Sequence, residues 1–256
     1  MDEIEWARLR AAELRRLAER DAVVIVPVAS QEQHGPHLPV QIDTLLCTAV
    51  AHRAARRAAE RRPVVVLPPV WTGLSEHHMA FGGTITLDFA TFHALLRGIC
   101  LSLKRHGFRR ILLLNGHGGN VAALKVVVEE LTRELGLGIS TVTYWHHAAE
   151  AFRSILERQD NVRHACEAET SMAMALIPDL VDTAKLAEAR GPEASVRGEP
   201  EGEGLYRARS FAERTRNGVI GDPTAASPEK GERLLEAAAA ALAAELLRPE
   251  FGVWSS

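Results

Sequence analysis

Acidic and imidazole side chains lie close together in an early stretch of this sequence. Glu32 and His34 are two residues apart, and Asp43 follows nine residues after His34. Residues two apart in extended backbone project to the same side, so Glu32 and His34 can face one point. Asp43 can return to that point after a Pro-containing loop and bridge two cations. Two carboxylates with an imidazole suit Zn²⁺, Mn²⁺ or Fe²⁺, whereas Mg²⁺ and Ca²⁺ favour oxygen ligands.

Each of these acids also has an ordinary structural explanation. Asp43 would serve as a helix N-cap, and Glu32 would be a surface acid of a loop. For either residue taken alone, the structural interpretation is favoured.

A further histidine, His117, lies in the segment Asn-Gly-His-Gly-Gly-Asn. Flanking glycines let the backbone approach closely, so the imidazole can point into a crowded site, and Gly118 and Gly119 are candidate substrate contacts. A Gly-rich turn that opens a helix also suits a phosphate, but neither GxGxxG nor GxxxxGK[ST] occurs. A capping turn with an incidental histidine is the structural alternative.

A second acidic cluster, 163–171, precedes an apolar helical segment predicted at 172–177. Thr170 and Ser171 could be caps of that helix. Glu169 borders the apolar segment, and a buried carboxylate needs a cation or hydrogen bonds. Glu169 is therefore a candidate metal ligand or neighbour of a metal.

Short apolar or β-branched runs are the elements that would position these groups. They occur at 23–28, 64–67, 111–114 and 139–144, and helical patterns separate them at 43–60, 89–106 and 120–135. Runs without alternation are typical of strands buried on both faces of a parallel sheet. Strands that alternate with helices predict a layered α/β fold.

Other segments complete the predicted organisation. An amphipathic helix is expected at 5–20, and Gly-Leu-Gly at 136–138 is a helix stop. An Ala-rich helix should begin at Ser227-Pro228 and run to about Leu247, because Ser caps helices and Pro fits the first turn. The Gly-rich stretch 191–204 is expected to be a surface loop.

The polar clusters follow the predicted strands, and seven of the eleven histidines lie in these post-strand segments. Sites of open α/β sheets gather at the carboxyl ends of strands. The sequence therefore predicts that these segments form one site. Its pocket residues would include His77, His78 and Trp145, although a structural Trp-His corner explains Trp145 equally well.

Composition limits the function further. The 256 residues carry a net charge of −3, with Lys+Arg at 30 and Asp+Glu at 33, which does not favour a nucleic-acid partner. The three cysteines are scattered, which fits a reducing compartment, and Cys166 is expected to be a buried inert thiol rather than a nucleophile. No apolar run indicates a signal peptide or a membrane span, so we expect one cytoplasmic domain over residues 1–256.

Five segments together resemble the signatures of the creatininase (creatinine amidohydrolase) family. They are VPVASQEQHGPHLPVQIDT at 26–44, SEHHMAFGGT at 75–84, NGHGGN at 115–120, HACEAETS at 164–171 and GVIGDP at 218–223. The resemblance covers about residues 20–245, and the first and third segments are its most specific parts. It implies a three-layer α/β/α sandwich with a mostly parallel central sheet, one or two divalent metals, and commonly a homohexamer.

The resemblance also implies roles for individual residues. Glu32, Asp43 and His117 would hold one metal, and His34 with Asp43 would hold a second. His164 would lie near the substrate and pass protons, and Glu169 would be a metal ligand or support one. Family members that act on creatinine carry a glutamate where this chain has Gly119. Either Glu169 completes the second site here, or the second metal is weak or absent.

The predicted reaction is hydrolysis of an amide-type C–N bond by a metal-activated water, with His164 or an acid donating a proton to the leaving nitrogen. The substrate would be a small molecule such as a cyclic amide or a formamide. A peptidase of the mycofactocin-maturation type and a hydrolase or lyase of a cyclic keto-sugar or lactone remain alternatives. A non-catalytic metal- or nucleotide-binding protein is a further, less favoured one.

Overall fold

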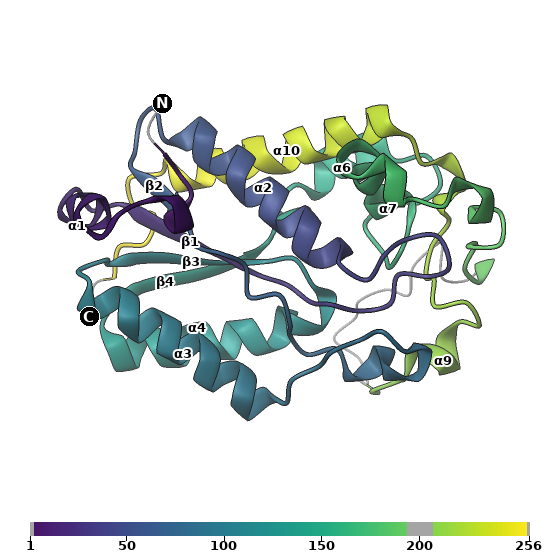
Figure 1. Ribbon diagram of the computed structural model, residues 1–256, viewed down its shortest axis with the longest axis horizontal. Coiled ribbons are helices and arrows are strands. Elements are labelled where there is room, and N and C mark those ends of the chain that lie inside the picture. The colour runs from purple at the N-terminus through teal and green to yellow at the C-terminus, as the bar shows by residue number, and fades with distance from the viewer. Residues whose placement is uncertain (1–2, 194–206, 255–256) are drawn as a thin grey trace.

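A single parallel sheet forms the centre of the structure. Figure 1 shows the computed structural model, which describes residues 3–193 and 207–254. The described strands are β1 (Val23–Val28), β2 (Val64–Val66), β3 (Arg110–Asn115) and β4 (Gly138–Thr143), in the order β2-β1-β3-β4. Neighbouring strands pair in parallel, with Val24 opposite Ile111 and Leu112 opposite Ser140. The predicted α/β fold with a parallel central sheet is confirmed.

Both faces of this sheet are covered by apolar side chains. Every residue of β1 is buried. Val23 and Ile25 belong to one hydrophobic cluster, and Val24 and Val26 belong to a second one. Successive side chains of a strand point to opposite faces, so an unbroken apolar run supplies both clusters at once.

Helices form the layers on either side of the sheet. The long helices are α2 (Ile42–Ala58), α3 (Phe89–Arg105), α4 (Val121–Leu135), α7 (Glu167–Leu176) and α10 (Pro228–Leu246). Shorter ones are α1 (Ala11–Glu19), α5 (Tyr144–His147), α6 (Ala149–Ile155) and α9 (Phe211–Arg214). In Figure 1, α2 and α10 lie on one side of the sheet and α3 and α4 lie on the other. The three predicted layers are present.

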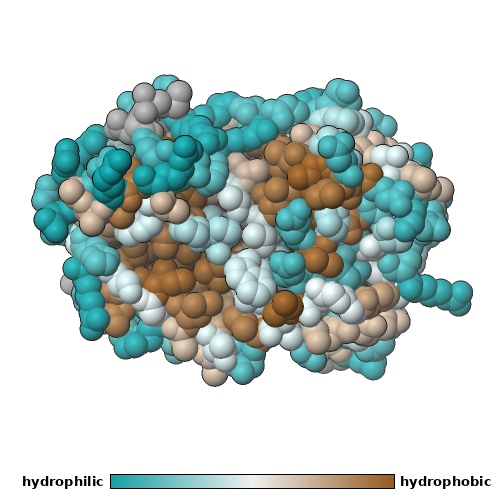
Figure 2. All heavy atoms as spheres, in the orientation of Figure 1, coloured by the Kyte–Doolittle hydropathy of each residue, from teal (hydrophilic) through white to brown (hydrophobic). Residues whose placement is uncertain are grey.

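Short 3-10 helices connect the larger elements. They are η1 (Trp6–Arg8), η2 (Glu76–Phe81), η3 (Gly118–Asn120), η4 (Pro178–Leu180), η5 (Thr183–Lys185) and η6 (Pro223–Ala225). Figure 2 shows hydrophilic residues around the rim of the molecule and hydrophobic ones toward the middle of the same view. No helix among the described residues is long and apolar enough to cross a membrane.

Two predicted helices have different bounds in the structure. The helix expected at 5–20 is interrupted, because Leu9 and Arg10 are extended between η1 and α1. This break accompanies packing of Trp6 against Phe108, whose ring centroids lie 5.3 Å apart. The helix expected at 172–177 begins instead at Glu167.

The prediction that Thr170 and Ser171 cap this helix is wrong. Cys166 is the extended residue that precedes α7, and both hydroxyl residues lie inside the helix. The segment 167–171 is fully buried, so packing carries it into the helix although its residues are polar.

The predicted helix ends elsewhere are confirmed. Gly136 ends α4 with a φ of 62°, a left-handed conformation that glycine adopts without strain. Ser227 caps α10 by accepting a hydrogen bond from the Lys230 backbone N–H. Of the loop predicted at 191–204, residues 194–204 lie outside the described residues.

Candidate metal centre

The candidate ligands come from four segments that meet at the carboxyl ends of the strands. Glu32 and His34 follow β1, and His117 follows β3. Asp43 is the second residue of α2, and Glu169 lies in the first turn of α7. All five side chains are buried, with exposed fractions of 5% or less. The structure thus brings together every residue predicted as a metal ligand.

Asp43 lies between two imidazoles and presents a different oxygen to each. Its Oδ2 is 2.9 Å from Nδ1 of His117, and its Oδ1 is 3.2 Å from Nε2 of His34. A carboxylate oriented in this way can bridge two cations. The bridging role predicted for Asp43 therefore matches its geometry.

The other nitrogen of each imidazole faces a backbone carbonyl. His34 Nδ1 lies 3.1 Å from the Glu32 carbonyl oxygen, and His117 Nε2 lies 3.1 Å from that of Leu74. A carbonyl only accepts, so in each ring this nitrogen carries the hydrogen and donates it. When these two rings are neutral, the lone pairs of His34 Nε2 and His117 Nδ1 face the carboxylates, as in metal-binding histidines.

Glu32 is held by several side chains. Its Oε2 accepts hydrogen bonds from the Ser75 hydroxyl at 2.7 Å and the Ser30 hydroxyl at 3.0 Å, and lies 3.2 Å from His117 Nδ1. Its Oε1 is 3.2 Å from His78 Nε2. These contacts aim one carboxylate oxygen at the imidazole of His117.

Glu169 approaches the opposite side of Asp43. Its Oε1 is 4.0 Å from His34 Nε2, and its Oε2 accepts a hydrogen bond of 2.5 Å from the Ala165 backbone N–H. Ala165 has a φ of 53°, which is unusual for a residue with a Cβ. The strained turn at Ala165 thus helps to point the Glu169 carboxylate toward His34.

These contacts define three groups that could hold an ion, with the ligand atoms of each within 4.8 Å of one another. Their members are Glu32, Asp43 and His117; His34, Asp43 and Glu169; and Glu32, His34 and His164. The first two groups share Asp43. The Asp43 carboxylate thus belongs to two candidate ion-binding groups at once.

The ionisation of the site is strongly perturbed. Burial lowers the pKa of His34, but Asp43, Glu169 and Glu32 outweigh it and raise that pKa to about 9. Burial raises the pKa of Glu169 to about 8, with Asp43 and Glu32 adding to it and His34 opposing. Despite burial, the carboxylates of Glu32 and Asp43 also hold the pKa of His117 well above its usual value. A positive charge among the buried carboxyl groups of Glu32, Asp43 and Glu169 would therefore stabilise their ionised forms.

The residues fit a divalent transition metal. Buried carboxylates are costly unless a cation or hydrogen bonds offset the charge. His34 Nε2 is buried and makes no hydrogen bond within the described residues, although it lies near two carboxylates. A mixed set of imidazole and carboxylate ligands suits Zn²⁺, Mn²⁺ or Fe²⁺.

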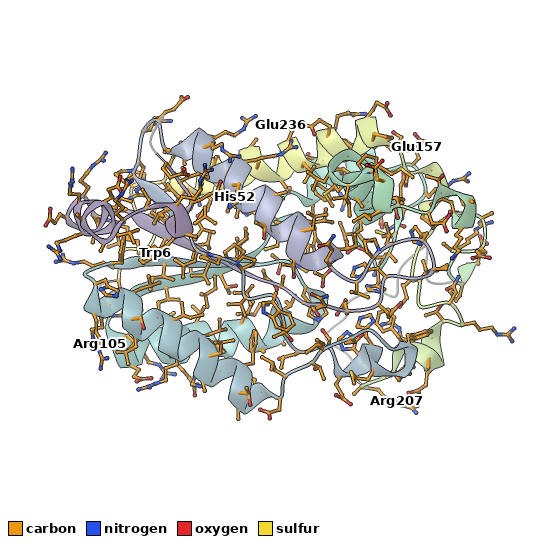
Figure 3. All side chains as sticks on the ribbon, viewed as in Figure 1. Trp6, His52, Arg105, Glu157, Arg207 and Glu236 are labelled. Carbon is orange, nitrogen blue, oxygen red and sulfur yellow. The ribbon has the colours of Figure 1, made fainter. Side chains whose placement is uncertain are left out.

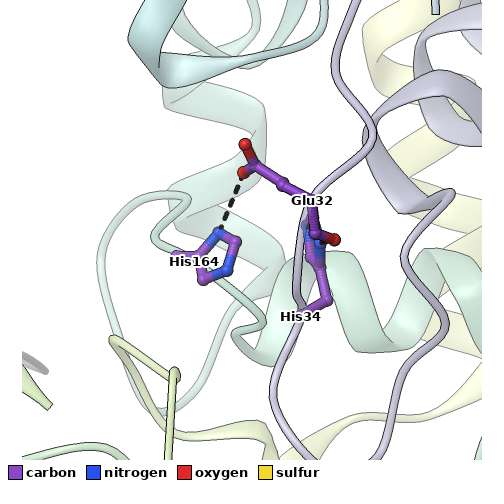
Figure 4. Close-up of side chains that lie close together, drawn as sticks. All are labelled: Glu32, His34 and His164. Carbon is purple, nitrogen blue, oxygen red and sulfur yellow. Dashed lines mark hydrogen bonds and ion pairs between the residues drawn. The ribbon is translucent and has the colours of Figure 1, made fainter. Parts of the chain in front are cut away.

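His164 lies against this cluster from the side of the second polar segment. Its Nδ1 is 3.5 Å from Glu32 Oε1, as Figure 4 shows, and its Nε2 donates to the Gln33 carbonyl at 2.7 Å. An antiparallel bridge with Ile220 fixes its backbone. Burial, together with His34 and His78, holds the pKa of His164 well below its usual value. The ring is therefore neutral near pH 7.

The predicted pocket residues differ in their relation to the centre. His78 contacts Glu32, and the half-buried ring of His77 stacks against His117 at 5.7 Å. Gly119 packs tightly between Leu74 and His77, and Gly118 has open space around its Cα. Trp145 packs edge-on against Tyr144 at 4.9 Å inside a hydrophobic cluster, and its contact with a substrate stays a prediction.

Two residues of the site region were not predicted. Gln33 donates through Nε2 to Gly218 O at 3.0 Å and contacts His78 Nδ1 at 2.9 Å. Tyr144 is buried, and burial followed by the charges of Glu169 and Asp43 raises its pKa well above the usual value. The position of Tyr144 directly after a strand is the one sequence signal that could have identified it.

Cys166 behaves as predicted. Its thiol is buried, and burial followed by the charge of Glu169 raises its pKa to about 12. A thiol with so high a pKa forms almost no nucleophilic thiolate at neutral pH.

Comparison with known proteins gives a consistent result. The family model Creatininase: Creatinine amidohydrolase matches residues 7–246. The mycofactocin precursor peptide peptidase of Mycolicibacterium smegmatis is 37% identical over 86% of this chain and 82% of its own length. The creatinine amidohydrolase of Pseudomonas putida is 30% identical over 97% and 96%. The 3-dehydro-scyllo-inosose hydrolase of Thermotoga maritima is 27% identical over 88% and 76%.

Solved structures agree with the sequence matches. A zinc–zinc form of a mutant creatininase has a TM-score of 0.82 at 29% identity and covers 98% of this chain and 99% of its own. A mutant creatininase complexed with creatine has a TM-score of 0.81 at 29% identity, with the same coverage. A structure named creatininase Mn has a TM-score of 0.80 at 30% identity, again covering 98% and 99%.

Proposed function

We propose that this chain, which belongs to the creatininase family of metal-dependent hydrolases, cleaves an amide-type C–N bond of a small substrate. The observation that carries the proposal is the position of Asp43, which presents one oxygen to His117 and the other to His34. This arrangement supports a two-metal centre at the carboxyl ends of the strands.

We assign one metal to Glu32, Asp43 and His117 and the second to His34, Asp43 and Glu169. By resemblance to the family, Gly119 stands where members that act on creatinine carry a glutamate. A Cβ at Gly119 would meet the Leu74 carbonyl oxygen at 2.3 Å and His77 Cε1 at 2.8 Å. A longer side chain there requires displacement of these neighbours, so Glu169 supplies the third ligand of the second metal.

Divalent cations bound by these residues would activate water as the nucleophile and polarise the scissile carbonyl. His78 and Ser75 hold Glu32 in position. His164 directs its Nδ1 toward Glu32, and we assign to it the transfer of a proton to the leaving nitrogen.

The relatives support two alternative substrates for the same centre. The 37% identity to a mycofactocin precursor peptide peptidase favours a peptide bond, which is itself an amide. The 27% identity to a 3-dehydro-scyllo-inosose hydrolase favours a cyclic keto-sugar. We place the amide first because two of the three relatives are named for amide substrates.

We also propose a cytoplasmic homo-oligomer, with a hexamer as the expected form by resemblance to the family. Each chain would contribute one creatininase-like domain. Sedimentation equilibrium of the purified protein measures the subunit number directly, and a monomer would contradict the assembly.

A screen of substrates with supplied metal tests the proposed reaction. The protein is loaded with Zn²⁺, Mn²⁺ or Fe²⁺ and incubated with cyclic amides, formamides, short peptides and cyclic keto-sugars. We expect turnover of an amide that Asp43→Ala abolishes. Turnover of keto-sugars alone would replace the amide assignment with the alternative.

A further inference from the structure

The short helix α9 lies over the histidine side of the metal centre. Its first residue, Phe211, is buried, and its ring centroid is 3.9 Å from that of His78, 4.9 Å from that of His164 and 5.4 Å from that of His77. Figure 1 shows α9 beside the blue turn η2, which carries His77 and His78. Phe211 therefore forms a wall of the site.

The chain that follows α9 is fixed to the segment that carries Glu32 and His34. Gly218 O accepts a hydrogen bond from Gln33 Nε2, and a Cβ at Gly218 would meet Gln33 Oε1 at 2.0 Å. The Asn217 side chain donates to the carbonyls of Glu188 at 2.8 Å and Arg190 at 3.1 Å. Gln33, which lies between Glu32 and His34, therefore joins the chain that follows α9 to the segment of these two candidate ligands.

The segment around α9 is strongly basic. Residues 207–216 carry arginines at 207, 209, 214 and 216 and one acid, Glu213, in a chain whose net charge is −3. These arginines are exposed, and Figure 3 shows Arg207 on the α9 side of the molecule. Exposed guanidinium groups thus lie along the segment 207–216, which contains α9.

Arg214 is the arginine of this segment with a defined relation to the site. Its guanidinium carbon lies 5.2 Å from the centroid of Phe211. The Phe211 ring in turn contacts that of His77, with centroids 5.4 Å apart. An anionic group of a bound molecule would meet the charge of Arg214 close to the metal centre.

We propose that α9 makes the site selective for substrates that carry an anionic group, carboxylate or phosphate, near the scissile bond. Arg214 would bind that group, and Phe211 would hold the guanidinium at the edge of the site. This inference rests on the proposed metal-dependent function and narrows its substrate class. Guanidinium groups suit both anions because their N–H donors match the oxygens of carboxylate and phosphate.

Three metal-binding probes separate this preference from metal binding itself. Acetohydroxamate is the neutral probe, succinomonohydroxamate adds a carboxylate, and phosphonoacetohydroxamate adds a phosphonate. Isothermal titration of the zinc-loaded protein gives the Kd of each. We expect one or both anionic probes to bind about fivefold to tenfold more tightly than the neutral one, since Arg214 is exposed and partly screened.

Variants of α9 identify the source of the preference. Arg214→Gln should remove it and leave the acetohydroxamate Kd unchanged, and Arg214→Lys should keep part of it. Phe211→Leu should weaken it because the guanidinium loses the ring beneath it. Arg105→Gln, which changes an exposed arginine distant from α9 in Figure 3, is the matched control and should bind all three probes like the unchanged protein.

Equal affinity for the three probes, or an anion preference that survives in Arg214→Gln, would overturn the role of α9 and leave the metal centre standing. Failure of every probe, including acetohydroxamate, would contradict the metal centre and this inference together. A preference for the carboxylate probe alone or the phosphonate probe alone would identify which anion the substrate carries.

Discussion

Asp43 Oδ1 lies 3.2 Å from His34 Nε2, and both side chains are buried. Each atom has an electron pair that can bind a cation, and the other nitrogen of His34 is already directed to a backbone carbonyl. Protonated His34 forms an ion pair with Asp43, which accounts for the raised pKa of His34, and loss of that proton frees both atoms to bind one cation.

Asp43→Ala should remove both metals, because Asp43 belongs to both ligand groups. We expect elemental analysis to find less than about a tenth of the zinc bound by the unchanged protein, since losing a shared ligand weakens both sites. Asp179→Ala, which changes an exposed aspartate of η4, is the control and should keep its metal. Full metal content in Asp43→Ala would refute the bridging role.

Glu169→Gln should reduce the metal content from two ions to one. The ion held by Glu32, Asp43 and His117 keeps its ligands, whereas the second loses a carboxylate. Metal titration monitored by calorimetry counts the sites. Retention of two equally tight sites would show that Glu169 is not a ligand.

Glu167→Gln is the matched control for that experiment. Glu167 is fully buried in the same helical turn, but its carboxylate accepts from Lys230 Nζ at 2.7 Å and from the Arg158 backbone N–H at 2.8 Å. Breaking a buried ion pair costs about 3 kcal/mol. This variant should therefore melt at a lower temperature and still bind two metals.

Gly119→Ala should weaken metal binding, and Gly118→Ala should not. A Cβ at Gly119 would lie 2.5 Å from His117 Nε2, whereas nothing lies within 4 Å of one at Gly118. Overpacking costs about 1–3 kcal/mol, and here the displaced group is a metal ligand. Competition with a chelator should show an affinity loss of roughly tenfold for Gly119→Ala alone. Equal affinities would contradict the packing argument.

The metal-free protein should lose stability as the pH rises from about 7 to 9. The folded pKa values of His34, about 9, and Glu169, about 8, both lie above the ordinary values. The folded state then binds more protons than the unfolded state, so stability decreases as these protons are lost. Thermal melts of chelator-treated protein at several pH values measure this effect.

Metal binding should show the opposite trend. Cations bind the deprotonated forms of these groups, so metal affinity should increase with pH up to about 9. Metal-loaded protein should therefore keep its melting temperature over a range in which the metal-free protein loses it. Parallel pH profiles for the two forms would indicate that these groups do not bind metal.

The sequence by itself determined the sheet and most of the candidate metal ligands. Unbroken apolar runs such as Val23–Val28 identify strands buried on both faces, and polar residues directly after such strands must meet at one edge of the sheet. Glu32, His34 and His117 are placed by this rule. These three side chains lie close together because each follows a buried strand and the strands are parallel.

Only the tertiary structure decided which more distant groups complete the site. Glu169 reaches His34 because α7 begins five residues earlier than its apolar pattern suggests, and Phe211 covers His78 from a segment without strong periodicity. Gln33 joins the early segment to Gly218 through one hydrogen bond. Such contacts depend on how separate helices and loops pack against one another. The spacing of residues along the chain does not predict that packing.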